Sequence, residues 1–466
     1  MSRTPGPAAE AQDPSAGSVS DHQLRQGLSQ RQLSMIALGG VIGAGLFVGS
    51  GVVIGDTGPA AFLTYALCGV LVVLVMRMLG EMAAANPSTG SFADYAGAAL
   101  GGWAGFSVGW LYWYFWVIVV GFEAVAGGKV LNYWFHAPLW VLSLCLMVLM
   151  TATNLFSVTS FGEFEFWFAG IKVATIAIFL GVGTVFVLGL WPGHGGGFAN
   201  LTAHGGFFPN GVGAVFAAIV VVIFSMVGAE IVTVAAAESR DPVRAVQRAT
   251  RSVVARIGIF FVGSVFLLVA MLPWNSVEPG ASPYVAAFKQ LGLPGADQVM
   301  NAVVLTAVLS CLNSGLYTAS RMLFVLADRH EAPLRLVKLS GRGVPHLAIL
   351  GSSAIGFLCV IMAWLAPHTV FLFLLNSSGA IILFVYWLIA LSQILLRRRT
   401  PTAQLRVKMW LFPVLSILTL AGITAVLVGM AFDSSARSQL WLSLLSWAVV
   451  LAVYVVIHRR RRGRAG

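Results

Sequence analysis

The sequence predicts an all-α membrane protein that crosses the bilayer many times, and three observations support this. Hydrophobic residues make up 58% of the chain and charged residues only 10%, whereas about a quarter of the residues in a soluble domain are charged. Most apolar segments reach the roughly 20 residues that a helix needs to cross a bilayer. The basic residues gather between these segments, as topology signals do, so the net charge of +11 does not indicate a nucleic-acid surface.

The N-terminal residues differ in composition from the rest of the chain. Residues 1–27 are rich in Pro, Ala, Gly, Ser and Gln and lack apolar periodicity, which predicts a disordered cytoplasmic tail. No basic segment with a short apolar core and a small-residue cleavage site is present, so the first span is expected to remain as a signal anchor. The transmembrane domain is expected over residues 28–466.

Twelve apolar segments follow one another along this domain, and the charges support that number. With the N-terminus in the cytoplasm, all but four of the 28 Lys and Arg residues fall on the cytoplasmic side or at span ends facing it. A missed or added span would exchange the sides of everything after it, so both termini are predicted to be cytoplasmic. The spans are predicted at about 30–55, 59–81, 102–130, 139–157, 164–190, 211–236, 252–273, 297–327, 346–366, 370–396, 407–430 and 440–458.

The first span contains a glycine-rich stretch at residues 39–45. Each glycine costs a helix about 1 kcal/mol relative to alanine, and an opened backbone in hydrocarbon is tolerated only where it faces protein or a polar cavity. A half-helix that begins at Gly43 to Gly45 would present free amides to a carboxylate. The carbonyls of Val41 and Ile42 would suit an ammonium group. The alternative is a kinked or closely packed span, because glycine is common in such helices.

A second interruption falls in the sixth span, where Ser225, Gly228 and Glu230 break a Val/Ile/Ala-rich helix. Spans one and six are equivalent if two inverted repeats cover about 30–190 and 211–396, followed by two extra helices at about 407–458. Paired interruptions at equivalent positions indicate the binding site of a secondary transporter. Together they favour a substrate site over kinked packing.

One lysine is predicted to lie deep in the membrane. Lys172 is about eight residues into span five, on the order of 12 Å from its cytoplasmic end, which is too far for easy snorkelling. Its ammonium therefore needs internal acceptors or must lose its proton. We expect it to exchange a proton during transport; the alternative is a structural ammonium that carbonyl groups hold permanently.

Four further polar residues are predicted inside spans. Glu230 follows the second break and is expected to gate the site, hold the helix or bind a substrate amine. Glu123, in span three, has the same options, and its structural and functional interpretations stay open. Asn313 and Ser314, in span eight, are expected either to line a polar site or to form interhelical hydrogen bonds.

Several motifs are absent from the sequence. It contains no GxxxxGK[ST] phosphate loop and no HExxH motif, which argues against an ATP-driven pump and a zinc peptidase. The four cysteines lie in apolar runs without metal-ligand spacing, so neither a metal site nor a disulfide framework is predicted. No enzymatic activity and no cofactor are expected.

Several stretches resemble those of amino acid permeases of the amino acid, polyamine and organocation superfamily. The resemblance runs from Leu28 to about Arg462, and three of the stretches are most similar to γ-aminobutyrate permeases. These three are 224–233, 310–323 and 376–380, and the others are 40–47, 80–82, 89–92, 162–167 and 235–239.

The resemblance implies a LeuT-type fold, with five plus five inverted helices and two more, that works by alternating access. It also implies proton-coupled import of a zwitterionic amino acid across the plasma membrane, with γ-aminobutyrate as the expected substrate. The alternatives are another amino acid, whether aromatic, neutral or cationic, and an exchanger or a sensor in place of an importer. The expected partners are the amino acid, a proton and the lipid bilayer.

Site residues are also implied by this resemblance. In such proteins the substrate carboxylate rests on amides of the first break, and the amine meets carbonyls of both breaks. Lys172 matches the lysine that replaces a sodium ion in proton-coupled relatives. The matching residues in this chain are Gly43, Ala44 and Gly45 for the carboxylate, and Val41 or Ile42 with Phe224, Ser225 or Val227 for the amine.

Overall fold

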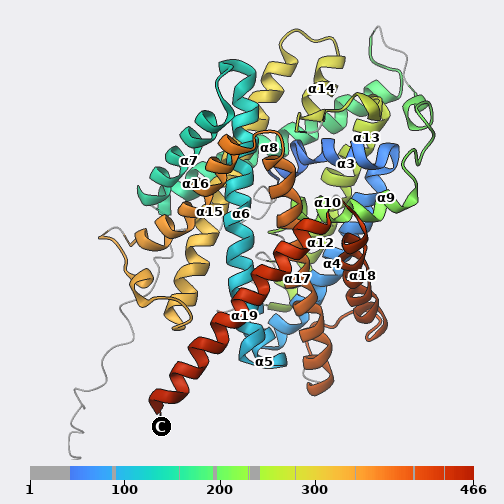
Figure 1. Ribbon diagram of the computed structural model, residues 1–466. Helices are drawn as coiled ribbons and strands as arrows, with labels where there is room; N and C mark the ends of the chain where they lie inside the picture. Colours follow the sequence, from blue (N-terminus) through green and yellow to red (C-terminus); the bar gives the residue numbers. More distant parts are fainter. Residues whose placement is uncertain are drawn as a thin grey trace, which may run out of the picture.

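In the computed structural model, the described part of the chain consists of helices joined by turns and loops and contains no strand. Ten of the described helical stretches are long and apolar enough to cross a membrane, and Val212–Met226 is a shorter apolar helix (Figure 1). The predicted tail, Val41 and the end of the predicted sixth span lie outside the described residues. The structure describes residues 42–86, 91–156, 158–192, 197–228, 230, 242–278, 280–341, 343–401, 405–434 and 436–465.

The helices follow the predicted order of apolar segments. The first two predicted spans form one continuous helical stretch, Ala44–Ala85, in which successive helices follow one another without a polar loop. The principal helices are α2 (Ala44–Phe47), α3 (Gly49–Thr57), α4 (Ala61–Ala85), α5 (Ser91–Leu100), α6 (Gly102–Phe135), α7 (Leu139–Phe156), α8 (Val158–Val187), α9 (Val212–Ala217), α10 (Ile219–Met226), α12 (Pro242–Arg256), α13 (Ser264–Met271), α14 (Pro283–Gln290), α15 (Ala296–Asp328), α16 (His346–Leu365), α17 (Val370–Arg399), α18 (Val414–Phe432) and α19 (Arg437–Ala465).

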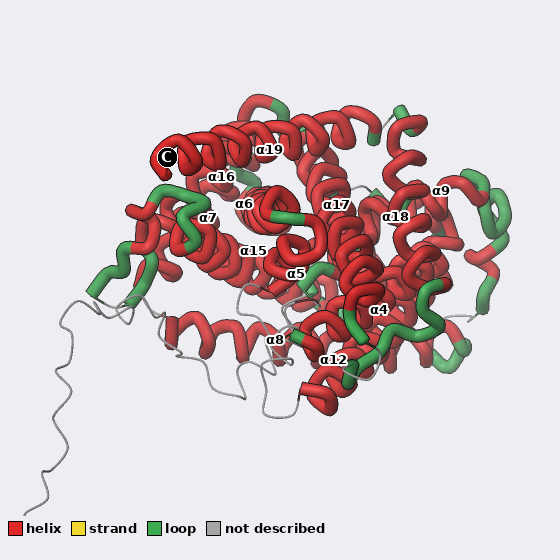
Figure 2. The backbone as a smooth tube through the Cα atoms, turned by 90° about the horizontal axis from the view of Figure 1, so that it is seen from below, coloured by secondary structure: helices red, strands yellow, loops and turns green. Residues whose placement is uncertain are grey.

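Helix α6 forms the centre of the bundle. It packs against α5, α7, α15, α16 and α17. In the most apolar 18 residues of α6, 83% of the residues are buried inside the protein, against 11% for the corresponding stretch of α19. Figure 2 shows α6 surrounded by other helices and α19 along the edge. Side chains on α6 therefore face protein, whereas α19 presents an apolar surface that suits lipid.

Two short helices end or begin inside this bundle. The chain is extended at Gly43, where φ is −134° and ψ is −155°, and α2 begins at the next residue. Helix α10 ends at Met226, Val227 is extended, and Gly228 has a φ of +105° that favours glycine. Helix α10 packs against both α2 and α3, so these two irregular points are neighbours.

Close backbone contact holds α10 in place. A Cβ added to Gly379 on α17 would overlap the carbonyl oxygen of Val220 on α10. Because backbone cannot move aside as a flexible side chain can, this crossing requires glycine. The position of α10, and with it the interruption after Met226, is therefore fixed by α17.

A buried carboxylate ties α4 to the chain between α17 and α18. The oxygens of Glu81 accept hydrogen bonds from Gln393 Nε2 at 2.7 Å and from the Met409 amide at 2.6 Å. Arg397 lies 3.9 Å from the same carboxylate. Since Glu81 is only 2% exposed, these partners offset the cost of burying its charge.

Candidate functional site

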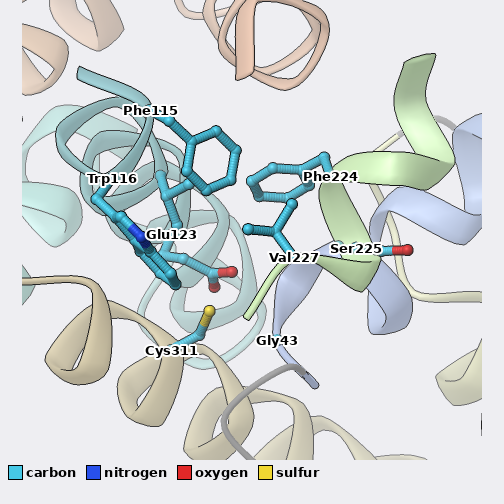
Figure 3. A pocket seen from close by; sticks show the side chains of 10 residues that line it. Gly43, Phe115, Trp116, Glu123, Phe224, Ser225, Val227 and Cys311 are labelled. Carbon is cyan, nitrogen blue, oxygen red and sulfur yellow. The ribbon is translucent and has the colours of Figure 1, made fainter. Parts of the chain in front are cut away.

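A small cavity lies where the two interruptions meet α6 and α15 (Figure 3). Its volume is about 20 Å³, enough for roughly one water molecule. An amino acid therefore needs side chains to move before it can enter. The lining residues are Gly43, Gly45, Phe115, Trp116, Val119, Glu123, Phe224, Ser225, Val227 and Cys311.

The Glu123 carboxylate occupies the first interruption. The Ala44 amide, at the start of α2, donates to both Glu123 oxygens, at 3.1 and 3.2 Å. Glu123 is fully buried on α6, and Figure 3 shows it directed toward Gly43 and Cys311. The amide that the sequence assigns to a substrate carboxylate thus already binds a carboxylate of the protein itself.

Two glycines bring the surrounding backbones into contact. A Cβ on Gly43 would lie 2.7 Å from Cys311 Sγ and from Glu123 Oε1, and a Cβ on Gly45 would lie 2.9 Å from Ser225 Cα. Real Cβ contacts are longer than these distances. Close approach of backbone is one of the uses of glycine, and here it lets α2 touch both α10 and α15.

Aromatic side chains close the other side of the cavity. Phe115 and Trp116 come from α6, and Phe224 comes from the end of α10. The Phe122 ring, about two turns further along α6, packs edge to face on Phe224 with 4.8 Å between centroids. The cavity walls are therefore apolar except at Glu123, Ser225 and the exposed backbone.

Lys172 lies behind this wall in a separate buried cluster. Its Nζ donates to Ser310 Oγ at 2.7 Å, and Ser310 Oγ donates to Glu165 Oε1 at 2.6 Å. Nζ is 4.0 Å from Glu165 Oε1, and all three side chains are fully buried. Ser310 precedes Cys311 on α15, so one residue separates the cluster from the cavity.

Glu165 is absent from the set of site residues that the sequence predicts. It precedes Lys172 by seven residues, or two turns, which places both side chains on one face of α8. This spacing is visible in the sequence. A buried lysine requires a compensating charge, and the search for one along the same helix face would have found Glu165.

Glu230 connects the chain after α10 to helices α6 and α17 at the second interruption. Its carboxylate accepts hydrogen bonds from Tyr112 on α6 at 2.9 Å and from Tyr386 on α17 at 3.0 Å. It also accepts from the Gly228 amide at 3.0 Å. The geometry matches the helix-holding option for Glu230, because the contacts join the chain after α10 to two long helices.

We expect Tyr112→Phe and Tyr386→Phe each to lower the thermal unfolding midpoint. Each removes a hydrogen bond to a buried carboxylate, which contributes about 1.5–3 kcal/mol. Reaction of a fluorogenic maleimide with the buried cysteines during heating, after the exposed Cys145 has been blocked, reports the midpoint. The control is Tyr133→Phe, whose exposed hydroxyl donates to Asp297. Equal shifts for all three variants would show that the Glu230 contacts do not hold the bundle together.

Asn313 and Ser314 lie outside the cavity lining. Asn313 Oδ1 accepts a hydrogen bond from Asn154 Nδ2 at 2.7 Å, which joins α15 to α7. The buried Ser314 hydroxyl has no hydrogen-bond partner in the described part of the chain. For Asn313 the geometry matches the interhelical option.

The predicted substrate residues are mostly brought together. Gly43, Gly45, Phe224, Ser225 and Val227 line the cavity, and Ala44 presents its amide there. Ile42 is buried but is not part of the lining, and Val41 lies outside the described residues. Four further residues line the cavity and are absent from the predicted substrate residues: Phe115, Trp116, Val119 and Cys311. The aromatic run 110–116, which includes Phe115 and Trp116, is typical of helix packing or groove lining as well as of an aromatic-substrate site.

The model of the amino acid permease family matches residues 32–464. The chain belongs to this family. It is therefore a multi-pass membrane transporter of amino acids and not an enzyme, in agreement with the prediction from the sequence. Both the interrupted segments and the buried Lys172 cluster fall inside the matched region.

Curated relatives have similar length. The permease is 54% identical to the γ-aminobutyric acid permease of Bacillus subtilis over 94% of both chains. It is 47% identical to that of Escherichia coli, covering 88% of this chain and 89% of the relative. Identity to the aromatic amino acid transport protein AroP of Corynebacterium glutamicum is 40%, over 95% and 98% of the two chains.

A solved structure resembles this permease in fold. A mutant of the manganese transporter of Eremococcus coleocola superposes with a TM-score of 0.57 over 92% of each chain. The sequences are only 12% identical. The likeness therefore extends to the arrangement of helices in a transporter and not to the substrate.

Proposed function

We propose that this permease imports γ-aminobutyrate together with protons across the plasma membrane. The main support is the 54% identity to the Bacillus subtilis γ-aminobutyric acid permease over nearly the whole of both chains. The Escherichia coli relative of the same name supports the same substrate. Identity to the aromatic amino acid transporter is lower, at 40%.

The proposed architecture is the LeuT type, with twelve spans and both termini in the cytoplasm. The repeats cover about 30–190 and 211–396, with extra helices at about 407–458. The likeness to a transporter over 92% of each chain supports this arrangement. So does the pairing of two helix interruptions near one cavity, which is typical of inverted-repeat transporters.

The substrate carboxylate is proposed to bind the amides of Gly43, Ala44 and Gly45. The contact between the Ala44 amide and Glu123 supports this, because it shows that a carboxylate fits at the start of α2. The substrate ammonium then faces carbonyls of both interruptions, from Val41 or Ile42 and from Phe224, Ser225 or Val227. Backbone dipoles compensate both charges, since an unpaired buried charge is costly.

The shape of the cavity favours an unbranched substrate. Phe115, Trp116 and Phe224 crowd it, and its volume is about 20 Å³. γ-Aminobutyrate carries no substituent along its three methylene groups, so its accommodation displaces fewer side chains than that of a bulky α-amino acid. Apolar walls beside the methylenes also favour binding.

Lys172 is proposed to carry the coupling proton. It is protonated when the transporter faces outward and releases the proton after the loaded transporter turns inward. Its complete burial and the neighbouring Glu165 support this role, because an ionisable group inside a membrane protein is a functional residue by default.

Uptake into proteoliposomes tests the proposal. With the potential clamped and an inward gradient of one pH unit, one proton per substrate drives about tenfold accumulation. We expect radiolabelled γ-aminobutyrate to reach this ratio, to equilibrate once the gradient is collapsed, and to be competed best by short ω-amino acids. Accumulation of an α-amino acid in place of γ-aminobutyrate would reject the proposed substrate. Exchange that needs no proton would reject the coupling.

A further inference from the structure

We propose that Glu165 receives the coupling proton from Lys172 through the Ser310 hydroxyl and passes it toward the cytoplasm. The inference rests on the proposed proton coupling of Lys172. It assigns the release step to a carboxylate that the family resemblance did not bring into the predicted site.

The hydrogen bonds form a continuous chain. Lys172 Nζ donates to Ser310 Oγ at 2.7 Å, and Ser310 Oγ donates to Glu165 Oε1 at 2.6 Å. These distances are short enough for proton transfer along each bond. The direct distance from Nζ to Oε1 is 4.0 Å, which is too long for a hydrogen bond. The serine is therefore a necessary bridge in this arrangement.

The transfer balances in charge and in protons. One N–H bond of the Lys172 ammonium breaks as an O–H bond forms on Ser310, while the original serine proton moves to Glu165 Oε1. An ammonium and a carboxylate become an amine and a carboxylic acid, and Ser310 remains a hydroxyl. Both products are neutral, which suits a buried site because charges there are costly.

Other titratable groups near Lys172 are less well placed as acceptors. The groups that act on its charge are Glu165 on α8, Cys311 on α15 and Glu123 on α6. Among the described residues, the carboxylate that lies within 4.0 Å of Lys172 Nζ is that of Glu165. Glu123 is held by the Ala44 amide on the cavity side. The hydrogen-bond chain thus leads away from the substrate.

The direction of the chain fits proton release. Glu165 precedes Lys172 by seven residues on α8, so it lies roughly 10 Å nearer the end at which this helix begins. Helix α8 begins at Val158, and the proposed topology puts this end in the cytoplasm. Glu165 Oε2 has no hydrogen-bond partner in the described part of the chain, so one oxygen is left to pass the proton on when the helix end opens.

The Glu165→Gln variant distinguishes two roles for Glu165, that of a proton acceptor and that of a passive counter-ion. Exchange of internal for external γ-aminobutyrate cycles between loaded, protonated states and needs no proton release, whereas net accumulation does. We expect the variant in proteoliposomes to exchange within about twofold of the unmodified permease. Its accumulation ratio at a gradient of one pH unit should fall from about ten to below one, because net uptake needs the release step. Glu163→Gln, an exposed carboxylate on the same helix, is the matched control and should accumulate normally.

A second pair of variants keeps the test decisive if Glu165→Gln fails to fold. Ser310→Ala removes the bridge and keeps both charges, and Ser310→Thr restores the hydroxyl. A relay predicts that Ser310→Ala exchanges but accumulates at least fivefold less than Ser310→Thr. Equal accumulation by these two variants would overturn the relay and leave Glu165 as a counter-ion. If the unmodified permease shows no proton-driven accumulation, the proposed coupling itself fails, and the relay fails with it.

Discussion

A permease in which Lys172 is replaced by alanine should no longer accumulate substrate in response to a pH gradient. Lys172 is the group proposed to take up the coupling proton and pass it to Glu165, so without it the accumulation ratio should fall from about ten to about one at a gradient of one pH unit. Radiolabelled uptake into proteoliposomes with a clamped potential measures the ratio. Lys289→Ala, an exposed lysine on α14, should retain full accumulation.

Loss of folding could imitate this result, and a paired variant removes the ambiguity. Lys172→Ala leaves Glu165 as a buried carboxylate without its cation, which costs about 3–5 kcal/mol. The double variant Lys172→Met with Glu165→Gln replaces the ion pair by neutral groups of similar size. We expect it to fold and bind substrate but not to couple transport to protons. Accumulation by this variant with an unchanged dependence on external pH would exclude Lys172 as the coupling residue.

The second large effect is expected at the glycines of the first interruption. A Cβ on Gly45 would lie 2.9 Å from Ser225 Cα, which belongs to backbone and cannot rotate away. Overpacking of this kind costs about 1–3 kcal/mol, so we expect Gly45→Ala to lower initial uptake by roughly 5-fold to 150-fold. Gly43→Ala should do the same, because its Cβ would meet Cys311 and Glu123.

Gly55 offers a matched control on the neighbouring helix. A Cβ at Gly55, within α3, would have no neighbouring atom within 4 Å. Gly55→Ala should therefore leave uptake unchanged and stabilise the helix by up to about 1 kcal/mol. Uptake per reconstituted molecule, with the thermal midpoint measured in parallel, separates a blocked site from a damaged fold. Normal uptake by Gly45→Ala would show that the contact between α2 and α10 is not needed for transport.

The all-helical membrane fold could be predicted from the sequence because its determinants are local. Hydropathy sets the length of each apolar segment, and glycine marks where helix is costly. The interruption before Ala44 and the end of α10 at Met226 both fall where glycine and polar residues break an apolar run. The first two predicted spans illustrate a limit, since a short 3-10 turn joins them where hydropathy alone suggests a gap.

The partners of the buried charges could not be predicted in the same way. Glu123 and the Ala44 amide are 79 residues apart, and Tyr386 reaches Glu230 across 156 residues. Such contacts depend on how helices cross, which local pattern does not encode. Glu165 is different, because its position two turns before Lys172 is a local signal. The aromatic side chains of α6 do not indicate a site by themselves, because helix packing and cavity lining use the same residue types.

The contact between Glu123 and the Ala44 amide also affects what a measured affinity means. A substrate carboxylate that binds this amide, as proposed, competes with the Glu123 carboxyl group. That group is attached to the same molecule, so its effective concentration is in the millimolar range or above. The substrate carboxylate then replaces Glu123 at the Ala44 amide, and the apparent affinity is weaker than the intrinsic affinity.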